Sequence, residues 1–325
     1  KMNALRADSP DTRNPPDAVL SRVLRTVLHA CPKLVALEMA YNNNAGPMCC
    51  VELARSGIES LVVDYCDKMW GAHTHFRNSR MSKTLKKLVA QDNSELKIGG
   101  IVNFLGGSHQ CNKLGCKSLV HVDFRDCRNL RTGALCYLAE ANPGLQTFIV
   151  GGSKRINDLV LSVLGEHCHK LVHVDFTGIK ASDEAVVDLA SGCPALEVVK
   201  WGETKTTDMA LVALSVYCKG LRRLEFEIHE HPYDYKGHQY TSRGIGKVAI
   251  RCKKLETLKM FSKEKSVFPD TVLRSLAKLP CLVELWLQGP GFDFYTEWSL
   301  LELIRDIPTL RKLVINASYR FQIGK

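Results

Sequence analysis

The side chains best suited to chemistry are two identical histidine–aspartate pairs. The hexapeptide LVHVDF occurs twice and contributes His121 with Asp123, and His173 with Asp175. Residues two apart on an extended strand point to the same face of a sheet. If the two segments are strands two positions apart, the paired side chains lie about 10 Å from each other, too far to share one metal ion. The pairs therefore indicate an acidic surface for a cationic side chain, or only a repeated structural consensus.

A second group of side chains has the chemistry of metal ligands but an irregular spacing. His109, Cys111 and Cys116 follow the pattern H-x-C-x4-C, and His73 and His75 precede them. Structural zinc sites have characteristic ligand spacings, and this pattern matches none of them. Cys116 also opens a C-x-x-L motif, which gives it a structural explanation. We therefore predict no bound metal and no cofactor.

Aromatic and histidine side chains gather between residues 228 and 243, in IHEHPYDYKGHQYTSR. This segment includes His231, Tyr233, Tyr235 and Tyr240. Tyrosine and tryptophan are enriched at the residues that dominate protein-binding energy. The segment is our first candidate for contact with a partner, and FDFYTEW at 292–298 is the second. The alternative is an insertion that packs only on its own neighbouring repeat.

Motifs of common enzyme active sites are missing from the sequence. The GGS segments at 106–108 and 151–153 lack the Gly-Lys that follows in a phosphate-binding loop. The G-x-S-x-G motif of a nucleophilic serine does not occur. We therefore expect that the protein is not an enzyme.

A regular repeat must position these side chains. Cys168, Cys193 and Cys218 open three units spaced 25 residues apart. Each unit begins C-x-x-L, continues with alternating apolar residues and then takes on a helical apolar period. A period of this length is typical of leucine-rich repeats, in which one strand and one helix form a unit. A single unit cannot bury its apolar faces, so the fold requires stacked neighbours.

The same anchor pattern extends over nearly the whole chain, although it is weak at Leu85. We predict an α/β leucine-rich-repeat solenoid, a horseshoe with about eleven parallel strands on its concave face and helices on its convex face. Residues 1–16 are polar and proline-rich and are predicted to be a disordered lead-in, and 17–325 to be one domain. The first anchors are Leu34, Ile58, Leu85, Leu119, Leu145, Leu171, Leu196, Leu221, Leu255, Leu282 and Leu310.

Residues between the anchors must point to the concave face, because strand side chains alternate. The predicted central row is Glu38, Val62, Val89, Asp123, Ile149, Asp175, Lys200, Glu225, Lys259, Trp286 and Val314. Four insertions at 66–82, 91–116, 228–243 and 289–298 follow strand ends and share one edge. We predict that a protein partner contacts this face and these loops through His121, Asp123, His173, Asp175, Arg223, Phe261, Trp286, His231, Tyr233 and Tyr235.

The composition excludes several classes of function. The chain has 325 residues and a net charge of +10, but no basic stretch with interleaved aromatic residues, so we do not expect nucleic-acid binding. No apolar run reaches the roughly 18 residues of a membrane-spanning helix. The 13 cysteines are odd in number and mostly linked to the repeat, which favours buried thiols over disulfides. We therefore expect a monomer in the reducing cytoplasm or nucleus.

Two further features define the type of repeat. A cysteine closes the strands in LVVDYC (61–66) and VDFRDC (122–127), and helical halves read SDEAVVDLASGC (182–193) and TDMALVALSVYC (207–218). The unit thereby resembles the cysteine-containing leucine-rich repeats of F-box proteins. That resemblance implies the substrate-recognition domain of a cullin-type (SCF) ubiquitin ligase.

The F-box itself has no counterpart in residues 1–30, where we find nothing like its L-P-x-E start. Either an F-box lies upstream of residue 1, in which case a ubiquitin-ligase adaptor is an expected partner, or the protein has none. Two other functions therefore stay open under the same resemblance. One is a non-catalytic scaffold in a ciliary or cell-cycle complex. The other is a small-molecule sensor whose inserted loops enclose a ligand, as in plant hormone receptors with this architecture.

Overall fold

The computed structural model describes residues 16–70, 79–96, 116–202, 204–228, 240–262, 270–289 and 297–316. The chain divides into two compact units, Lys1–Leu171 and Val172–Lys325. In each unit, short strands alternate with helices along the chain. The repeating strand–helix architecture confirms the predicted leucine-rich-repeat type of fold. None of the helices in these ranges is both long and apolar enough to cross a bilayer.

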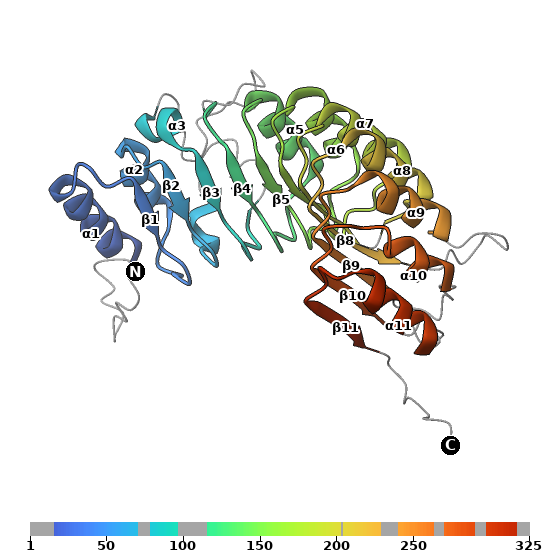
Figure 1. Ribbon diagram of the computed structural model, residues 1–325. Coiled ribbons are helices and arrows are strands. Elements are labelled where there is room, and N and C mark those ends of the chain that lie inside the picture. The colour runs from blue at the N-terminus through green and yellow to red at the C-terminus, as the bar shows by residue number, and fades with distance from the viewer. Residues whose placement is uncertain are drawn as a thin grey trace. The chain divides into compact units, whose positions relative to one another are not determined.

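The first unit contains five described strands, which pair in parallel and in chain order (Figure 1). They are β1 (Ala36–Glu38), β2 (Ser60–Val62), β3 (Lys87–Val89), β4 (His121–Asp123) and β5 (Thr147–Ile149). The helices are α1 (Pro16–Ala30), α2 (Pro47–Arg55), α3 (Arg80–Thr84), α5 (Thr132–Ala141) and α6 (Leu159–His167), with the 3₁₀ helix η1 (Asp67–Trp70). The predicted register is confirmed, since Glu38, Val62, Val89, Asp123 and Ile149 are aligned partners.

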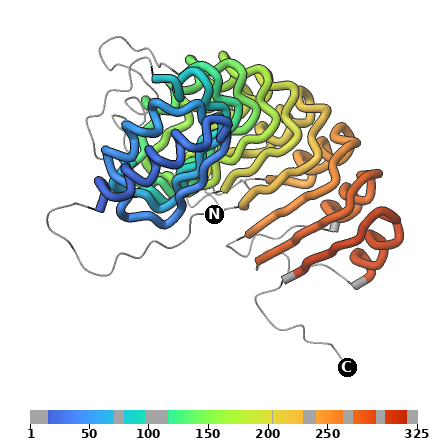
Figure 2. The backbone as a smooth tube through the Cα atoms, turned by 90° about the vertical axis from the view of Figure 1, so that its left-hand side faces the viewer, coloured from blue at the N-terminus to red at the C-terminus, as the bar shows by residue number. Residues whose placement is uncertain are grey.

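The second unit contains six described strands, which lie side by side with the helices along one face (Figure 2). They are β6 (His173–Asp175), β7 (Val198–Lys200), β8 (Arg223–Ile228), β9 (Thr257–Ser262), β10 (Glu284–Gln288) and β11 (Lys312–Asn316). The helices are α7 (Asp183–Gly192), α8 (Asp208–Tyr217), α9 (Ser242–Arg251), α10 (Asp270–Leu276) and α11 (Glu297–Asp306). The aligned row is Asp175, Lys200, Glu225, Lys259, Trp286 and Val314, again as predicted.

Most cysteines at repeat boundaries belong to the core, as their spacing predicts. Cys127 donates its thiol to Ala90 O at 3.0 Å, and the Cys218 thiol lies 3.8 Å from Ala190 O. Each thiol thus reaches a backbone carbonyl of the preceding repeat. Burial raises the pKa of Cys127 to about 12. Among the described cysteines, Cys31 and Cys281 are exposed.

Aspartates at the start of one helix cap the next helix. In the first unit, Asp17 accepts hydrogen bonds from Gly46 N and Met48 N, both at 2.9 Å. In the second unit, Asp183 accepts from Thr207 N at 2.8 Å and from Ala210 N at 3.0 Å. Helix N-termini have unpaired N–H groups and a positive dipole end, so a carboxylate there stabilises the helix. These links fix the spacing of the helices and therefore that of the strands.

Candidate protein-interaction surface

The face of the sheet that points away from the helices is called the open face below. In the second unit its most distinctive residue is Trp286, at the middle of β10. Lys259 Nζ lies 4.7 Å from the centroid of the indole ring, and Lys312 Nζ lies 4.6 Å from it. A tryptophan face attracts cations because its quadrupole is negative there. The buried Trp286 Nε1 has no hydrogen-bond acceptor among the described residues.

One carboxylate beside this tryptophan is shared by several cations. Glu225 lies 3.2 Å from Lys259 Nζ, 3.6 Å from Lys200 Nζ and 4.0 Å from Arg223 Nε. In the part of the chain that the structure describes, no carboxylate lies within ion-pair distance of Lys312. These residues, Lys200, Arg223, Glu225, Lys259, Trp286 and Lys312, form the Trp286 cluster. Its cations outnumber its carboxylates, so the cluster suits an acidic contact.

The other predicted residues of the second unit have different surroundings. Asp175 is 9% exposed and accepts hydrogen bonds from Thr177 N at 3.1 Å and Thr177 Oγ1 at 2.8 Å. His173, two residues earlier on β6, is half-buried, and so is Phe261, which is aligned with Glu227 and Gln288.

The aromatic segment at 228–243 is only partly described. His231, Tyr233 and Tyr235 lie outside the described residues. Tyr240 is described, and it is only 2% exposed and belongs to the core, so this residue of the segment is not available to a partner. Its ring packs edge-on against Phe226, and its hydroxyl accepts a hydrogen bond from Trp201 Nε1 at 2.9 Å.

In the first unit, the histidine–aspartate pair has its own intramolecular partners. Asp123 is 3% exposed and accepts from Arg125 Nη2 at 2.7 Å and from Gln91 Nε2 at 2.8 Å. Burial and the nearby charge of Lys87 lower the pKa of His121, which favours the neutral imidazole. The cationic side chain expected beside Asp123 is therefore present as Arg125 of the same chain.

Two exposed tyrosines were missing from the predicted set. Tyr41 and Tyr65 follow β1 and β2 and stack on each other, with ring centroids 4.4 Å apart. They are separated by 24 residues, close to the repeat length, and this spacing was the available signal. Both tyrosines lie in short turns, whereas the predicted contact residues include aromatic residues of a long insertion.

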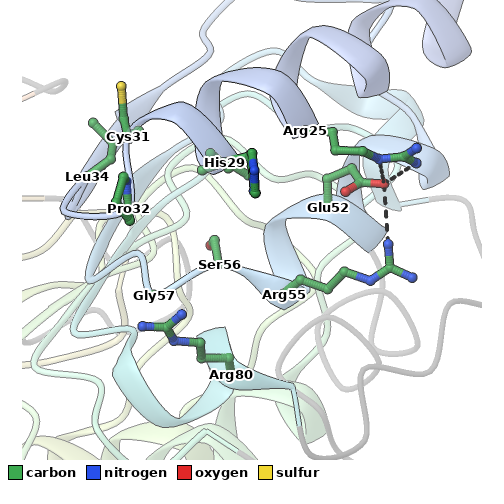
Figure 3. Close-up of a pocket in the computed structure, with 11 residues that line it drawn as sticks. Arg25, His29, Cys31, Pro32, Leu34, Glu52, Arg55, Ser56, Gly57 and Arg80 are labelled. Atoms are coloured by element: carbon green, nitrogen blue, oxygen red, sulfur yellow. Dashed lines mark hydrogen bonds and ion pairs between the residues drawn. The ribbon is translucent and has the colours of Figure 1, made fainter.

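A cavity of about 290 Å³ lies between α1, α2 and the start of α3 (Figure 3). Glu52 on its wall is 6% exposed and lies 2.6 Å from Arg25 Nη2 and 3.6 Å from Arg55 Nη1. Arg80 approaches the wall at Gly57, where an added Cβ would lie 3.3 Å from its guanidinium. The charged groups of the wall are three arginines and the buried Glu52, which is the composition of a structural ion-pair cluster.

Of the candidate metal ligands in the sequence, Cys116 belongs to the part of the chain that the structure describes. His73, His75, His109 and Cys111 lie outside the described residues. Cys116 is buried, and its thiol lies 3.7 Å from Leu85 O. The described ranges contain no cluster of three His, Cys, Asp or Glu side chains that could hold a metal ion.

Comparisons with known proteins agree with the fold. No protein-family model and no curated protein sequence matches the chain. A yeast Rad7 structure, solved in complex with Elc1, has a TM-score of 0.58 and 12% identity over 95% of this chain and 87% of Rad7. An internalin (InlF) of Listeria monocytogenes has a TM-score of 0.52 and 17% identity over 98% of this chain and 100% of the internalin. The chain is therefore a repeat protein with the leucine-rich-repeat type of fold.

Proposed function

We propose that this chain is a non-catalytic protein-recognition domain that receives substrates for an F-box-type ubiquitin ligase in the cytoplasm or nucleus. The Trp286 cluster is the observation that carries the recognition part of this proposal. The cysteine-containing form of the repeat favours the ligase part. The Rad7 structure adds an example of a similar fold in complex with another protein.

The chemistry of the Trp286 cluster favours an acidic segment of the partner. Lys259 and Lys312 flank the indole, and Lys259 is already paired with Glu225. A carboxylate of the partner would therefore pair with Lys312, which has no carboxylate within ion-pair distance among the described residues. The indole then offers an apolar surface to the rest of the segment. Tryptophan and arginine dominate binding hot spots, where truncation costs about 2 kcal/mol or more.

Affinity purification tests the proposal in living cells. The wild-type chain, Trp286→Ala and a Lys259→Glu/Lys312→Glu variant are purified from the same cells, with the exposed α8 substitution Tyr217→Ala as a matched aromatic control. We expect one set of proteins to be retained by wild type and control and lost by both cluster variants. We also expect these proteins to be degraded more slowly when the chain is depleted.

The two measurements separate the parts of the proposal. Equal recovery of all partners by the cluster variants would contradict recognition through Trp286. Recovery that depends on Trp286 with unchanged partner turnover would instead favour the scaffold function.

A further inference from the structure

The stacked tyrosines of the first unit form an aromatic surface that is open to solvent. Tyr41 is 75% exposed and Tyr65 is 40% exposed, and their rings are inclined by only 15°. Aromatic side chains bury large apolar areas when they are covered. This pair keeps much of that area in contact with water, so a partner that covers the rings gains binding energy.

The tyrosines are the first members of a row of equivalent turn positions. Tyr41 N donates to Asp64 O at 2.8 Å, Tyr65 N donates to Gln91 O at 3.0 Å, and Asp92 N donates to Arg125 O at 2.9 Å. The same backbone contact thus recurs from one turn to the next. It places Tyr41, Tyr65 and Asp92 beside each other along one edge of the sheet.

Carboxylates surround the tyrosine pair. The Asp92 carboxylate beside the Tyr65 hydroxyl raises the pKa of Tyr65 to about 12, and Asp64 directly precedes Tyr65. Burial, followed by the charges of Asp123, Glu38 and Asp92, raises the pKa of Asp64. The carboxylates therefore repel one another at this edge.

The arginine whose backbone carbonyl accepts from Asp92 N is already paired. Arg125 binds Asp123 through both Nε and Nη2. Glu38 is exposed on the open face, and no cation of the described residues lies within 4 Å of its carboxylate. The edge therefore combines an exposed aromatic surface with excess negative charge.

We infer that the surface formed by Tyr41, Tyr65, Glu38, Asp64 and Asp92 binds an arginine-containing segment of a protein partner. An arginine guanidinium is planar, stacks on aromatic faces and carries five N–H donors in a fixed fork. It can lie on the Tyr41 ring while it donates to the nearby carboxylates. A lysine ammonium is compact and strongly hydrated, so it uses the ring faces less well. This surface lies in the other unit and has the opposite charge from the Trp286 cluster, so the inference is independent of the proposed function.

Titration with synthetic peptides tests this inference. Three capped octapeptides of glycine and serine carry two arginines, two lysines or two citrullines, and binding is measured by NMR chemical-shift changes. We expect the arginine peptide to bind best, the lysine peptide more weakly and the neutral citrulline peptide not at all. Added salt should weaken binding, since the contacts are between exposed charges.

Substitutions locate the site on the protein. Tyr41→Asn and Tyr65→Asn suit the positive φ of 58° and 55° at these turns, because asparagine tolerates that conformation. Each should weaken binding about three- to fivefold, the contribution of an exposed cation–π contact. Tyr41→Phe should retain binding, and Tyr217→Ala on α8 of the second unit should have no effect.

A second set of variants tests the requirement for negative charge. These variants also test the inference if the tyrosine variants fail to fold. Glu38→Gln and Asp92→Asn change only charge, and each should weaken the arginine peptide but not alter the melting temperature by more than the Tyr217→Ala control. No detectable binding of the arginine peptide at millimolar concentration would overturn the inference. Equal binding of the arginine and citrulline peptides, or shifts confined to residues remote from Tyr41, would do the same.

Discussion

The buried hydroxyl of Tyr240 provides a quantitative test of the packing in the second unit. Its oxygen accepts a hydrogen bond from Trp201 Nε1 at 2.9 Å. The same hydroxyl forms a second hydrogen bond with the hydroxyl of Thr206. Thr206 in turn is hydrogen-bonded to Thr204 at 2.6 Å. Tyr240→Phe removes the shared oxygen and leaves the ring that packs on Phe226 in place.

The expected cost follows from the groups that lose their partner. Trp201 is 2% exposed and its Nε1 would have no other acceptor at this position, and such a buried unpaired donor costs about 1–3 kcal/mol. Thr206 keeps its bond to Thr204, so its contribution is small. We therefore expect Tyr240→Phe to lower the free energy of unfolding by about 2 kcal/mol.

Urea unfolding followed by tryptophan fluorescence measures this loss. Tyr217→Phe is the matched control, because Tyr217 is 44% exposed on α8 and its loss should cost less than about 0.5 kcal/mol. A double-mutant cycle with Trp201→Phe should show a coupling energy of about 1–2 kcal/mol between the two residues. If Tyr240→Phe costs no more than Tyr217→Phe, the buried hydrogen-bond network is not what holds this region together.

Three further predictions concern the open face and the thiols. Trp286→Ala, Arg223→Ala and deletion of 231–238 should each weaken partner binding by about 2 kcal/mol and leave the melting temperature nearly unchanged. Asp188→Ala on α7 should change neither partner binding nor the melting temperature. Loss of binding in Asp188→Ala alone would contradict this prediction. Cys193→Ala should cost on the order of 1 kcal/mol or somewhat more in urea unfolding, and unfolding of the wild type by strong reductant would refute the buried-thiol arrangement. Burial raises the pKa of Cys66 to about 11 and that of Cys168 to about 12, so the folded chain holds thiol protons that the unfolded chain releases above pH 9. Stability from these thiols is thus complete below about pH 9 and declines as the pH rises toward 12, and an unchanged urea midpoint between about pH 8 and pH 10 would contradict the assignment.

The positions of the strands could be predicted from the sequence because two regular spacings determine them. The 25-residue spacing of Cys168, Cys193 and Cys218 fixes the repeat, and the alternation of strand side chains fixes which residues share a face. Even β3, where the anchors are weak, forms a strand, because strands on both sides supply its hydrogen-bond partners. The alignment of residues between neighbouring strands can therefore be predicted from a single sequence.

The side-chain partners are less predictable because they depend on the turns. Arg125 reaches Asp123 from only two residues away, a contact that the strand pattern does not specify. Tyr240 lies in a segment rich in polar and aromatic residues, yet it is buried because Trp201 and Thr206 in the repeat before it offer hydrogen-bond partners. Tyr41 and Tyr65 stack because their turns share one backbone conformation, with φ of 58° and 55°.

Site-specific photo-crosslinking tests recognition through the open face most directly. A photoreactive phenylalanine analogue replaces either Phe261, on β9 beside the Trp286 cluster, or Tyr217, on the exposed side of α8. We expect irradiation in cells to join a protein partner to the chain from position 261 and not from position 217. We also expect the added substitution Trp286→Ala to abolish that product. Crosslinks that form only from position 217, or that form from 261 regardless of Trp286, would contradict recognition through the Trp286 cluster.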